Sequence, residues 1–223
     1  MELICRYFLY FIIYSFIGWS MEVICKLFEQ KKFINRGFLI GPICPIYGYG
    51  VLLIIILIGR ETKDILAVFL KAILVCSILE YFTSYFMEKL FKARWWDYSK
   101  RKYNINGRIC LETMIPFGIL GCLVVYVIHP IIKNIVSILS PTLTITLAII
   151  LFIIYIADNI ISFNVMNKIK LEIKRQTLDS TEIIRKKVLD WIDSNSVLYR
   201  HIKNAYPKFK IYNVKNKNYK SEE

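Results

Sequence analysis

Acidic side chains and two arginines interrupt the apolar stretches of this chain, and their types could do chemistry. Carboxylates and guanidinium groups bind charged ligands, carry protons or pair with each other. A charge placed among apolar residues is costly and therefore calls for a partner or a polar cavity. The candidate substrate-binding residues are Glu22, Asn35, Arg36, Glu80, Glu88, Asn106, Arg108, Glu112 and Asp158.

The spacing of the acidic residues predicts that several of them face one interior. Glu80, Ser84 and Glu88 recur every four residues, so they share one face of a helix. Asp158 and Ser162 have the same spacing near the end of the last apolar stretch. A polar cavity that opens at the cytoplasmic end of a helix bundle would accommodate both groups.

Each arginine belongs to a short polar motif that precedes an apolar stretch. The motif is Asn-Arg-Gly at 35–37 and Asn-Gly-Arg at 106–108. The free N–H groups and the dipole at a helix start attract anions. The sequence therefore predicts that an anionic headgroup, phosphate or carboxylate binds between the two arginines, with Glu80 or Asp158 as a second contact or a proton site.

A second interpretation gives the arginines a structural role. Ion pairs in a site of low dielectric constant hold helices together without touching a ligand. Under this interpretation Arg36 and Arg108 pair with Glu22, Glu88 or Glu112.

The elements that must position these residues follow from the composition. Of the 223 residues, 56% are hydrophobic and 21% are charged, and the charges lie in blocks between apolar runs. A soluble globule could not bury so much apolar surface, so the sequence predicts a membrane protein and excludes a cytosolic enzyme. The net charge of +13 is typical of basic cytoplasmic loops, and we expect no nucleic-acid partner.

A membrane-spanning helix needs about 20 apolar residues, and five stretches of the sequence qualify. Prolines cluster near the ends of these stretches, where the loss of an N–H donor is tolerated. We therefore expect an all-α, polytopic bundle of five transmembrane helices. The expected helices are Leu3 to Phe28, Pro42 to Ile58, Ile65 to Phe91, Ile109 to Ile132 and Thr142 to Val165.

The distribution of basic residues predicts the orientation of the bundle. With five spans, 25 of the 30 Lys and Arg residues fall on the side that holds the C-terminal tail. Cytoplasmic loops retain basic residues, so we expect the N-terminus outside and the C-terminus inside. The chain then divides into a transmembrane domain, residues 1–165, and a basic cytoplasmic tail, residues 166–223.

The tail contains an amphipathic helical pattern. Ile184, Val188, Trp191 and Ile192 form an apolar stripe after a capping signal at 179–181. A basic amphipathic helix of this kind can lie on an anionic membrane surface, on a partner subunit or on the inner face of the bundle.

The first four apolar stretches contain a pattern that predicts an internal duplication, and chance similarity between helix ends is the alternative. Each copy has Met-Glu near the end of a helix, at 21–22 and at 87–88, followed by a basic loop. Each continues with the arginine motif and a proline, Pro45 or Pro116. Two spans separate the copies, so both insert with the same orientation, as a parallel two-helix repeat.

The sequence contains no motif of a known catalytic site: GxSxG, HExxH, phosphate-binding loops and dinucleotide fingerprints are absent. Its two histidines, His129 and His201, lie far apart and have no cysteine beside them, so we expect no metal site and no cofactor. The sequence favours a non-enzymatic protein. A membrane enzyme that uses a carboxylate pair such as Glu80 and Glu88 is a further alternative.

The polar motifs occur in an order that resembles a known family. The segments concerned are Gly18 to Glu22, Asn35 to Gly48, Trp95 to Ser99 and Asn106 to Cys110. They are similar to the ABC-transporter type IV family, also called CmpB-like, over about residues 14–121. The resemblance implies a small bacterial multi-pass protein of the cell membrane that acts as a transporter permease. It assigns no catalytic or substrate residue.

Two functions follow from these expectations. The first is a transporter permease or substrate-binding membrane subunit with a polar site open to the cytoplasm. The chain has no nucleotide-binding domain, so ATP-driven transport would need a separate ATPase subunit, and five spans call for a homodimer or a complex. The alternative is a non-transporting protein that binds membrane lipids through its arginines or acts as a scaffold.

Overall fold

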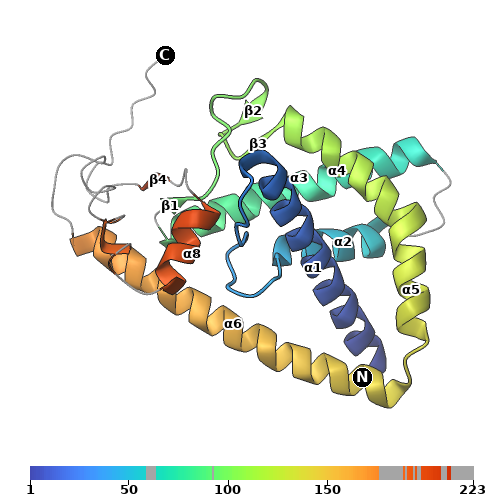
Figure 1. Cartoon of the computed structure of the whole chain (residues 1–223). Coiled ribbons are helices and arrows are strands. Elements are labelled where there is room, and N and C mark those ends of the chain that lie inside the picture. Colours follow the sequence, from blue (N-terminus) through green and yellow to red (C-terminus); the bar gives the residue numbers. More distant parts are fainter. Residues whose placement is uncertain are drawn as a thin grey trace.

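The chain folds into a bundle of helices with two very short strand pairs (Figure 1). A computed structural model describes residues 1–58, 64–91, 93–175, 188, 190–192, 194, 197–206, 210 and 211. The helices are α1 (Glu2–Gln30), α2 (Pro45–Ile58), α3 (Ile65–Phe91), α4 (Leu111–Leu123), η1 (Val124–Ile128), α5 (His129–Ser137), α6 (Pro141–Arg175) and α8 (Val197–Ala205). The strands are β1 (Ala93–Arg94), β2 (Asn104–Ile105), β3 (Ile109–Cys110) and β4 (Lys210–Ile211), paired antiparallel as β1 with β4 and β2 with β3. The expected helical fold is confirmed.

Four helices in the described part of the chain are long and apolar enough to cross a membrane. They are α1, α3, α6 and the continuous helix that α4, η1 and α5 form. Pro130 cannot donate an N–H to the preceding turn, and the π-helical turn η1 lies directly before the α5 helix that contains it. The expected span Pro42 to Ile58 is the 14-residue helix α2, which is about 21 Å long and shorter than a hydrocarbon core of about 30 Å.

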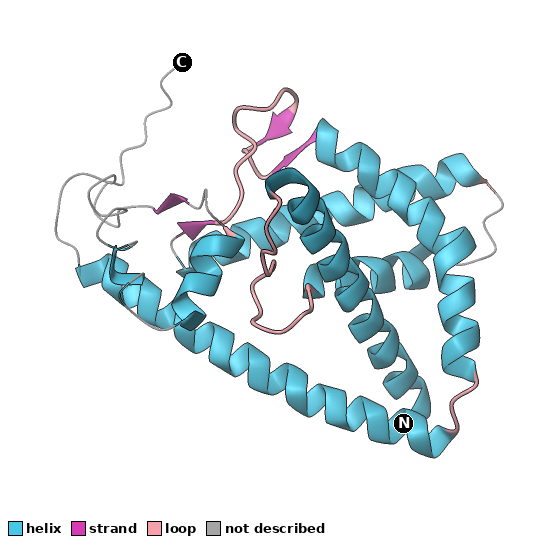
Figure 2. Cartoon of the chain, in the orientation of Figure 1, coloured by secondary structure: helices cyan, strands magenta, loops and turns pink. Residues whose placement is uncertain are grey.

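The connection between α1 and α2 turns back along α1. The Cys44 N–H donates to the carbonyl oxygen of Ser15 over 2.9 Å, halfway along α1. Gly48 permits this approach, because an added Cβ would collide with the Ser15 hydroxyl and the backbone carbonyl of Phe11. Residues 31–44, coloured as loop in Figure 2, therefore place non-helical backbone beside the middle of α1. We call these residues the returning segment.

The connection between α3 and α4 also folds back on the helix before it. Arg108, which precedes α4, donates to the Ser84 hydroxyl over 3.2 Å, about two turns before the end of α3. Gly37 and Gly107 have positive φ values of 97° and 64° beside the two arginines. Each half of the first four helices thus contains a long helix, a connection that folds back and a second apolar helix, which is short in α2 and is continued by η1 and α5 after α4. The duplication itself stays a prediction.

The C-terminal tail packs on the end of the bundle where these connections lie. Val188 and Ile192 are fully buried in one apolar cluster with Phe91, Trp95 and other residues. Strand β4 of the tail pairs with β1, directly after α3. In Figure 1, α6 runs along one edge of the bundle and α8 folds back beside its end.

The expected tail helix is therefore seen in part. Two residues of its apolar stripe are buried against the bundle, and Trp191 packs partly against the same cluster. The capping signal at 179–181 and Ile184 lie outside the described residues. Helix α6 continues as one helix past residue 165, and the division of the chain into two domains there stays a prediction.

Candidate substrate-binding site

Glu22, near the end of α1, binds Arg36 of the returning segment. Its Oε2 accepts a hydrogen bond from Arg36 Nε over 3.0 Å, and its Oε1 accepts one from the Tyr47 hydroxyl over 3.0 Å. The side chains of Arg36 and Glu22 are 18% and 28% exposed, so water screens the pair only in part. This ion pair joins α1, the returning segment and α2.

Asn35 stabilises the turn that carries Arg36. Its side-chain oxygen accepts from Trp19 Nε1 over 2.6 Å, and its amide group donates to the carbonyl oxygen of Ile40 over 2.7 Å. The side chain of Asn35 thus connects the returning segment to itself and to α1.

Asp158 of α6 holds the far end of the returning segment. Its two carboxylate oxygens accept the backbone N–H groups of Ile40 and Gly41 over 3.0 and 2.9 Å, and Ser162 donates to it over 3.2 Å. A Cβ on Gly41 would lie 2.7 Å from the Asp158 carboxylate, so glycine is needed for this contact. The carboxylate satisfies N–H groups that would otherwise be unpaired beside the helices.

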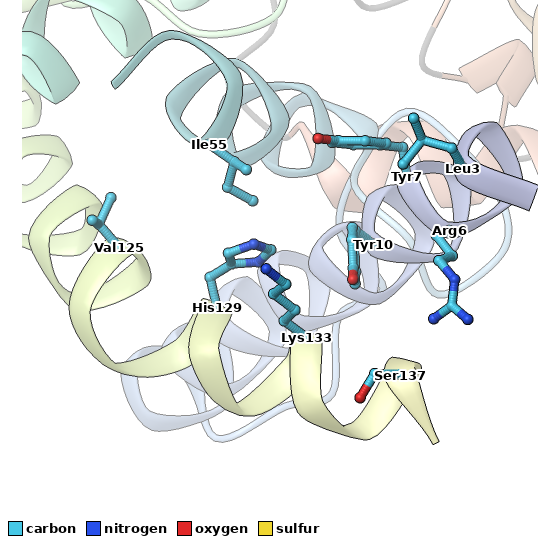
Figure 3. A pocket seen from close by; sticks show the side chains of 9 residues that line it. All are labelled: Leu3, Arg6, Tyr7, Tyr10, Ile55, Val125, His129, Lys133 and Ser137. Carbon is cyan, nitrogen blue, oxygen red and sulfur yellow. The ribbon is translucent and has the colours of Figure 1, made fainter. Parts of the chain in front are cut away.

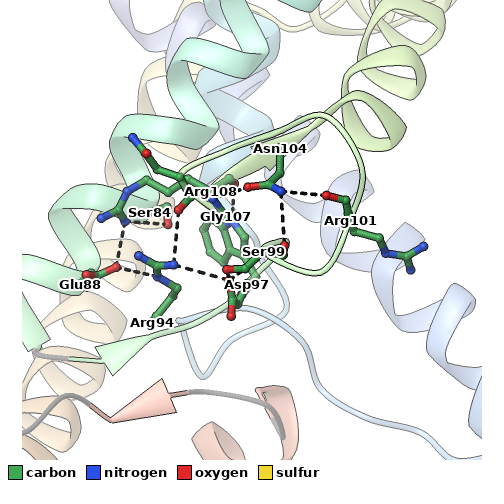
Figure 4. Close-up of polar contacts among 11 residues, drawn as sticks. Ser84, Glu88, Arg94, Asp97, Ser99, Arg101, Asn104, Gly107 and Arg108 are labelled. Carbon is green, nitrogen blue, oxygen red and sulfur yellow. Dashed lines mark hydrogen bonds and ion pairs between the residues drawn. The ribbon is translucent and has the colours of Figure 1, made fainter. Parts of the chain in front are cut away.

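Glu88, near the end of α3, joins two arginines. Its Oε2 accepts from Arg94 Nε over 2.8 Å and from an Arg108 terminal nitrogen over 2.9 Å. Arg94 also pairs with Asp97 over 3.4 Å. Figure 4 shows these four side chains converging at the end of α3. Two carboxylates therefore balance two guanidinium groups in this cluster.

The turn before α4 keeps Arg108 in place. The Asn106 side chain donates to the Tyr81 hydroxyl over 2.9 Å, and the backbone N–H of Gly107 donates to Asn104 over 2.9 Å. The guanidinium group of Arg108 lies 5.7 Å from the centre of the Tyr81 ring. Arg108 is 8% exposed, and cation–π contact adds to its ion pair.

Glu80 of α3 lies apart from these ion pairs and is 8% exposed. Its Oε1 accepts from the Tyr98 hydroxyl over 3.3 Å, whereas its Oε2 has no hydrogen-bond partner among the described residues. Burial, followed by the charge of Glu80, raises the pKa of Tyr98. Tyr98 is therefore a neutral phenol that can donate to the carboxyl group.

The tail covers Arg36 from its other side. The Arg36 guanidinium group lies 5.4 Å from the centre of the Tyr206 ring, which meets the edge of Trp95 at a centroid distance of 4.6 Å. His201 Nε2 lies 3.0 Å from the carbonyl oxygen of Leu39 and donates to it. Burial lowers the pKa of His201, which favours the neutral ring. The tail thus closes over the returning segment.

A cavity of about 360 Å³ lies at the opposite end of the bundle, between α1, α2, η1 and α5. Figure 3 shows the basic side chains of Arg6 and Lys133 in its lining, together with His129 and Tyr10. Arg6 is already paired with Glu2 over 2.7 Å. The sequence analysis did not find this cavity, because its lining comes from three distant parts of the chain and follows no spacing rule.

A comparison with protein families matches residues 9–163 to the family described as Putative ABC-transporter type IV. The chain belongs to this family. The match includes all nine candidate residues. Four helices of membrane-spanning length lie largely within the matched region, so this member of the ABC-transporter type IV family is a multi-pass membrane protein. No curated protein and no solved structure matches the chain.

In this family member, Arg36 and Arg108 pair with different carboxylates. Arg36 pairs with Glu22 and Arg108 pairs with Glu88, which is the arrangement of the structural interpretation. Glu112 does not join them: it is 57% exposed and pairs with Arg101 over 2.8 Å. Binding of a ligand by any of the nine candidates stays a prediction.

Sequence reasoning missed several partners of these residues. Tyr47 and Tyr98 lie in the segments that resemble the family, but their hydroxyl groups were not assigned to carboxylates. Arg94 counted only as a basic loop residue. Tyr206 has no local signal, since its contact with Arg36 spans most of the chain. Within the described ranges, no group of three His, Cys, Asp or Glu side chains is arranged to hold a metal ion.

Proposed function

We propose that the chain is the membrane subunit of a transporter, a permease whose substrate site lies around the returning segment. The observation that carries this proposal is the non-helical backbone of residues 31–44, which Asp158 and Ser15 hold among the helices. Lipid-exposed irregular backbone is not tolerated at membrane depth, so such backbone occurs where it is enclosed by protein or lines a cavity.

Short or interrupted helices in corresponding halves are the best structural pointer to a transporter site. Helix α2 has 14 residues, and α4 has 13 residues with Pro116 inside it, before the π-helical turn. Both follow connections that fold back on the preceding helix. This likeness supports the parallel repeat of α1–α2 and α3–α4.

The proposed topology has five crossings, with α2 and the returning segment together making the second. The N-terminus is outside and the tail is inside a bacterial cell membrane. This orientation agrees with the packing of the tail against the two basic connections, because all three then lie in the cytoplasm.

The ion pairs describe a closed site. In the proposed open state, Arg36 and Arg108 leave Glu22 and Glu88 and bind an anionic group of the substrate. This group takes the place of the two carboxylates as the partner of the arginines. Asn35, Asn106 and the surrounding turns position the arginines. A separate ATPase would dock on the basic cytoplasmic surface, and a second copy of the chain would complete the pathway.

Reciprocal purification tests the proposal. The tagged chain and a tagged ATPase should each co-purify the other from native membranes, and reconstituted ATP hydrolysis should respond to the chain. Asp158→Asn should weaken this response. Asp64→Asn is the matched control, because Asp64 caps α3 at the other end of the bundle and asparagine caps helices equally well. Absence of a reciprocal ATPase, with hydrolysis indifferent to the chain, would refute the proposal.

A scaffold or lipid-binding protein is the second candidate, and the closed ion pairs favour the scaffold. If the arginines bind anionic headgroups, native mass spectrometry should show retained lipid that is lost on Arg36→Ala and Arg108→Ala. Lipid retention that is the same in both variants and in the unchanged protein would argue against this candidate.

A further inference from the structure

Glu80 differs from the other acids that lie among the helices. Glu22 and Glu88 face guanidinium groups, and Asp158 accepts two backbone N–H groups. Glu80 takes part in no ion pair within the described residues, although it is more deeply buried than any of these three. A bare carboxylate at this depth would cost several kcal/mol.

The free oxygen of Glu80 is not an isolated feature. The Oγ of Ser77, one helical turn earlier on the same side of α3, is also buried and has no hydrogen-bond partner among the described residues. Buried polar atoms are nearly always satisfied, so two exceptions one turn apart on α3 call for an explanation.

The groups that face Glu80 in the described part of the chain supply no positive charge. Arg108 of the α3–α4 connection binds Ser84 and Glu88, which lie one and two turns beyond Glu80 on α3. Thr113 of α4 approaches the carboxyl group, but its hydroxyl donates to the carbonyl oxygen of Cys110. The titratable or charged groups within electrostatic range are Tyr47 of α2, Cys76 of α3, Tyr98 of the α3–α4 connection and, through Tyr98, Glu22 of α1.

We propose that Glu80 is a reversible proton-binding site: it holds a proton while the α3–α4 connection is closed over α3, and releases it when that connection moves away and water enters. The proton resides on Oε2, the oxygen without a partner among the described residues, and Tyr98 donates to Oε1. This inference goes beyond the proposed function and does not depend on an ATPase or a substrate.

A proton fits this position better than a metal cation does. Protonation neutralises the carboxylate without further ligands, whereas Na⁺ requires several oxygen atoms around it. The Tyr98 hydroxyl donates to Glu80 itself, and the Thr113 hydroxyl donates to the carbonyl oxygen of Cys110. The site therefore resembles the carboxyl groups that are kept neutral by burial and donate hydrogen bonds at neutral pH.

Infrared spectroscopy tests the protonation state directly. The protein is reconstituted in ether-linked lipids, which lack the ester carbonyl bands that would mask a carboxylic acid. At neutral pH the protein should show a carboxylic acid C=O band that is absent in Glu80→Gln and present in Glu29→Gln, an exposed acid paired with Lys26. Tyr98→Phe should move the band to higher frequency, since Oε1 then loses its donor.

Thermal unfolding provides a second, independent measurement. Glutamine imitates the protonated acid, so Glu80→Gln should fold. The melting temperature of the variant, relative to that of the unchanged protein, should increase as the pH rises above about 4.5, the pKa of a glutamate side chain in the unfolded chain. The expected gain is about 3 °C for each pH unit over which the folded protein keeps its proton.

Three results would overturn the inference. They are a neutral-pH spectrum without a Glu80-dependent acid band, a Glu80→Gln variant that does not fold, and Na⁺-specific stabilisation at constant ionic strength that disappears in Glu80→Gln. If the Glu80-dependent band is absent but the ATPase response is intact, only this inference is refuted. If the band is present but the ATPase response is absent, only the proposed function is refuted.

Discussion

Replacing Asp158 with asparagine tests the contact that holds the returning segment among the helices. Asparagine keeps one oxygen, which can still accept from Ile40 and Ser162. Its NH₂ group replaces the oxygen that now accepts from Gly41, so two donors face each other over 2.9 Å. A hydrogen bond to a charged group contributes about 1.5 to 3 kcal/mol, and we expect a loss of about 2 to 3 kcal/mol.

Two assays measure this loss. The melting temperature in detergent or nanodiscs should fall by roughly 5 to 10 °C. The thiol of Cys44, which is 3% exposed, should react faster with a maleimide by a factor of roughly 30 or more if the returning segment opens locally. Peptide mass spectrometry quantifies this labelling, with the exposed Cys25 as internal reference and Asp64→Asn as matched control. An unchanged melting temperature together with unchanged Cys44 protection would refute the role given to Asp158.

Three further substitutions have definite expected outcomes. Gly48→Ala should cost about 1 to 3 kcal/mol because the new methyl group meets backbone of α1, whereas Gly50→Ala, with its nearest neighbour at 3.6 Å, should be tolerated; denaturant or thermal unfolding compares them. Glu88→Gln should cost about 3 kcal/mol and Glu112→Gln less than about 1 kcal/mol, since only the first leaves the buried guanidinium group of Arg108 without a carboxylate partner. Tyr206→Ala should release the tail, detected as faster limited proteolysis after α6, and Tyr206→Phe should not, since the ring alone contacts the arginine.

The sequence predicted the class of the protein because hydrocarbon imposes simple rules. Long apolar runs must be helices, since no water is present to satisfy their backbone. This rule located α3 from Ile65 to Phe91 without error, and α1 to within two residues at each end. It also indicated that the charges of Arg36 and Arg108 need partners, and two of the three suggested carboxylates are those partners.

The returning segment could not be predicted by the same rule. Residues 38–40 are apolar and look like the start of a helix, yet Pro42 and Pro45 delay the helix until Pro45, the first residue of α2. What stabilises the intervening backbone is Asp158, a residue 118 positions from Ile40. A pattern within one stretch of sequence carries no information about such a partner.

Glu112 shows the limit of judging an acid by its position at the end of an apolar run. It lies in the first turn of α4, where the helix dipole favours a carboxylate, and this alone accounts for its placement. Glu80, which looks similar in the sequence, is buried because it lies on the face of α3 that packs on the α3–α4 connection. The two acids differ in burial, which depends on how each helix is rotated about its axis and therefore on which face it presents to the bundle.

The long sequence distance between the returning segment and its partners has a consequence for biosynthesis. The ribosome must add 118 residues after Ile40 before Asp158 exists, which takes roughly 6 to 24 s at typical elongation rates. During that interval the nascent chain has unsatisfied peptide groups beside its first helix. An insertase or a chaperone cavity is therefore expected to shelter this stretch, and Tyr206, a partner that arrives later still, would cover Arg36 only when the tail has been made.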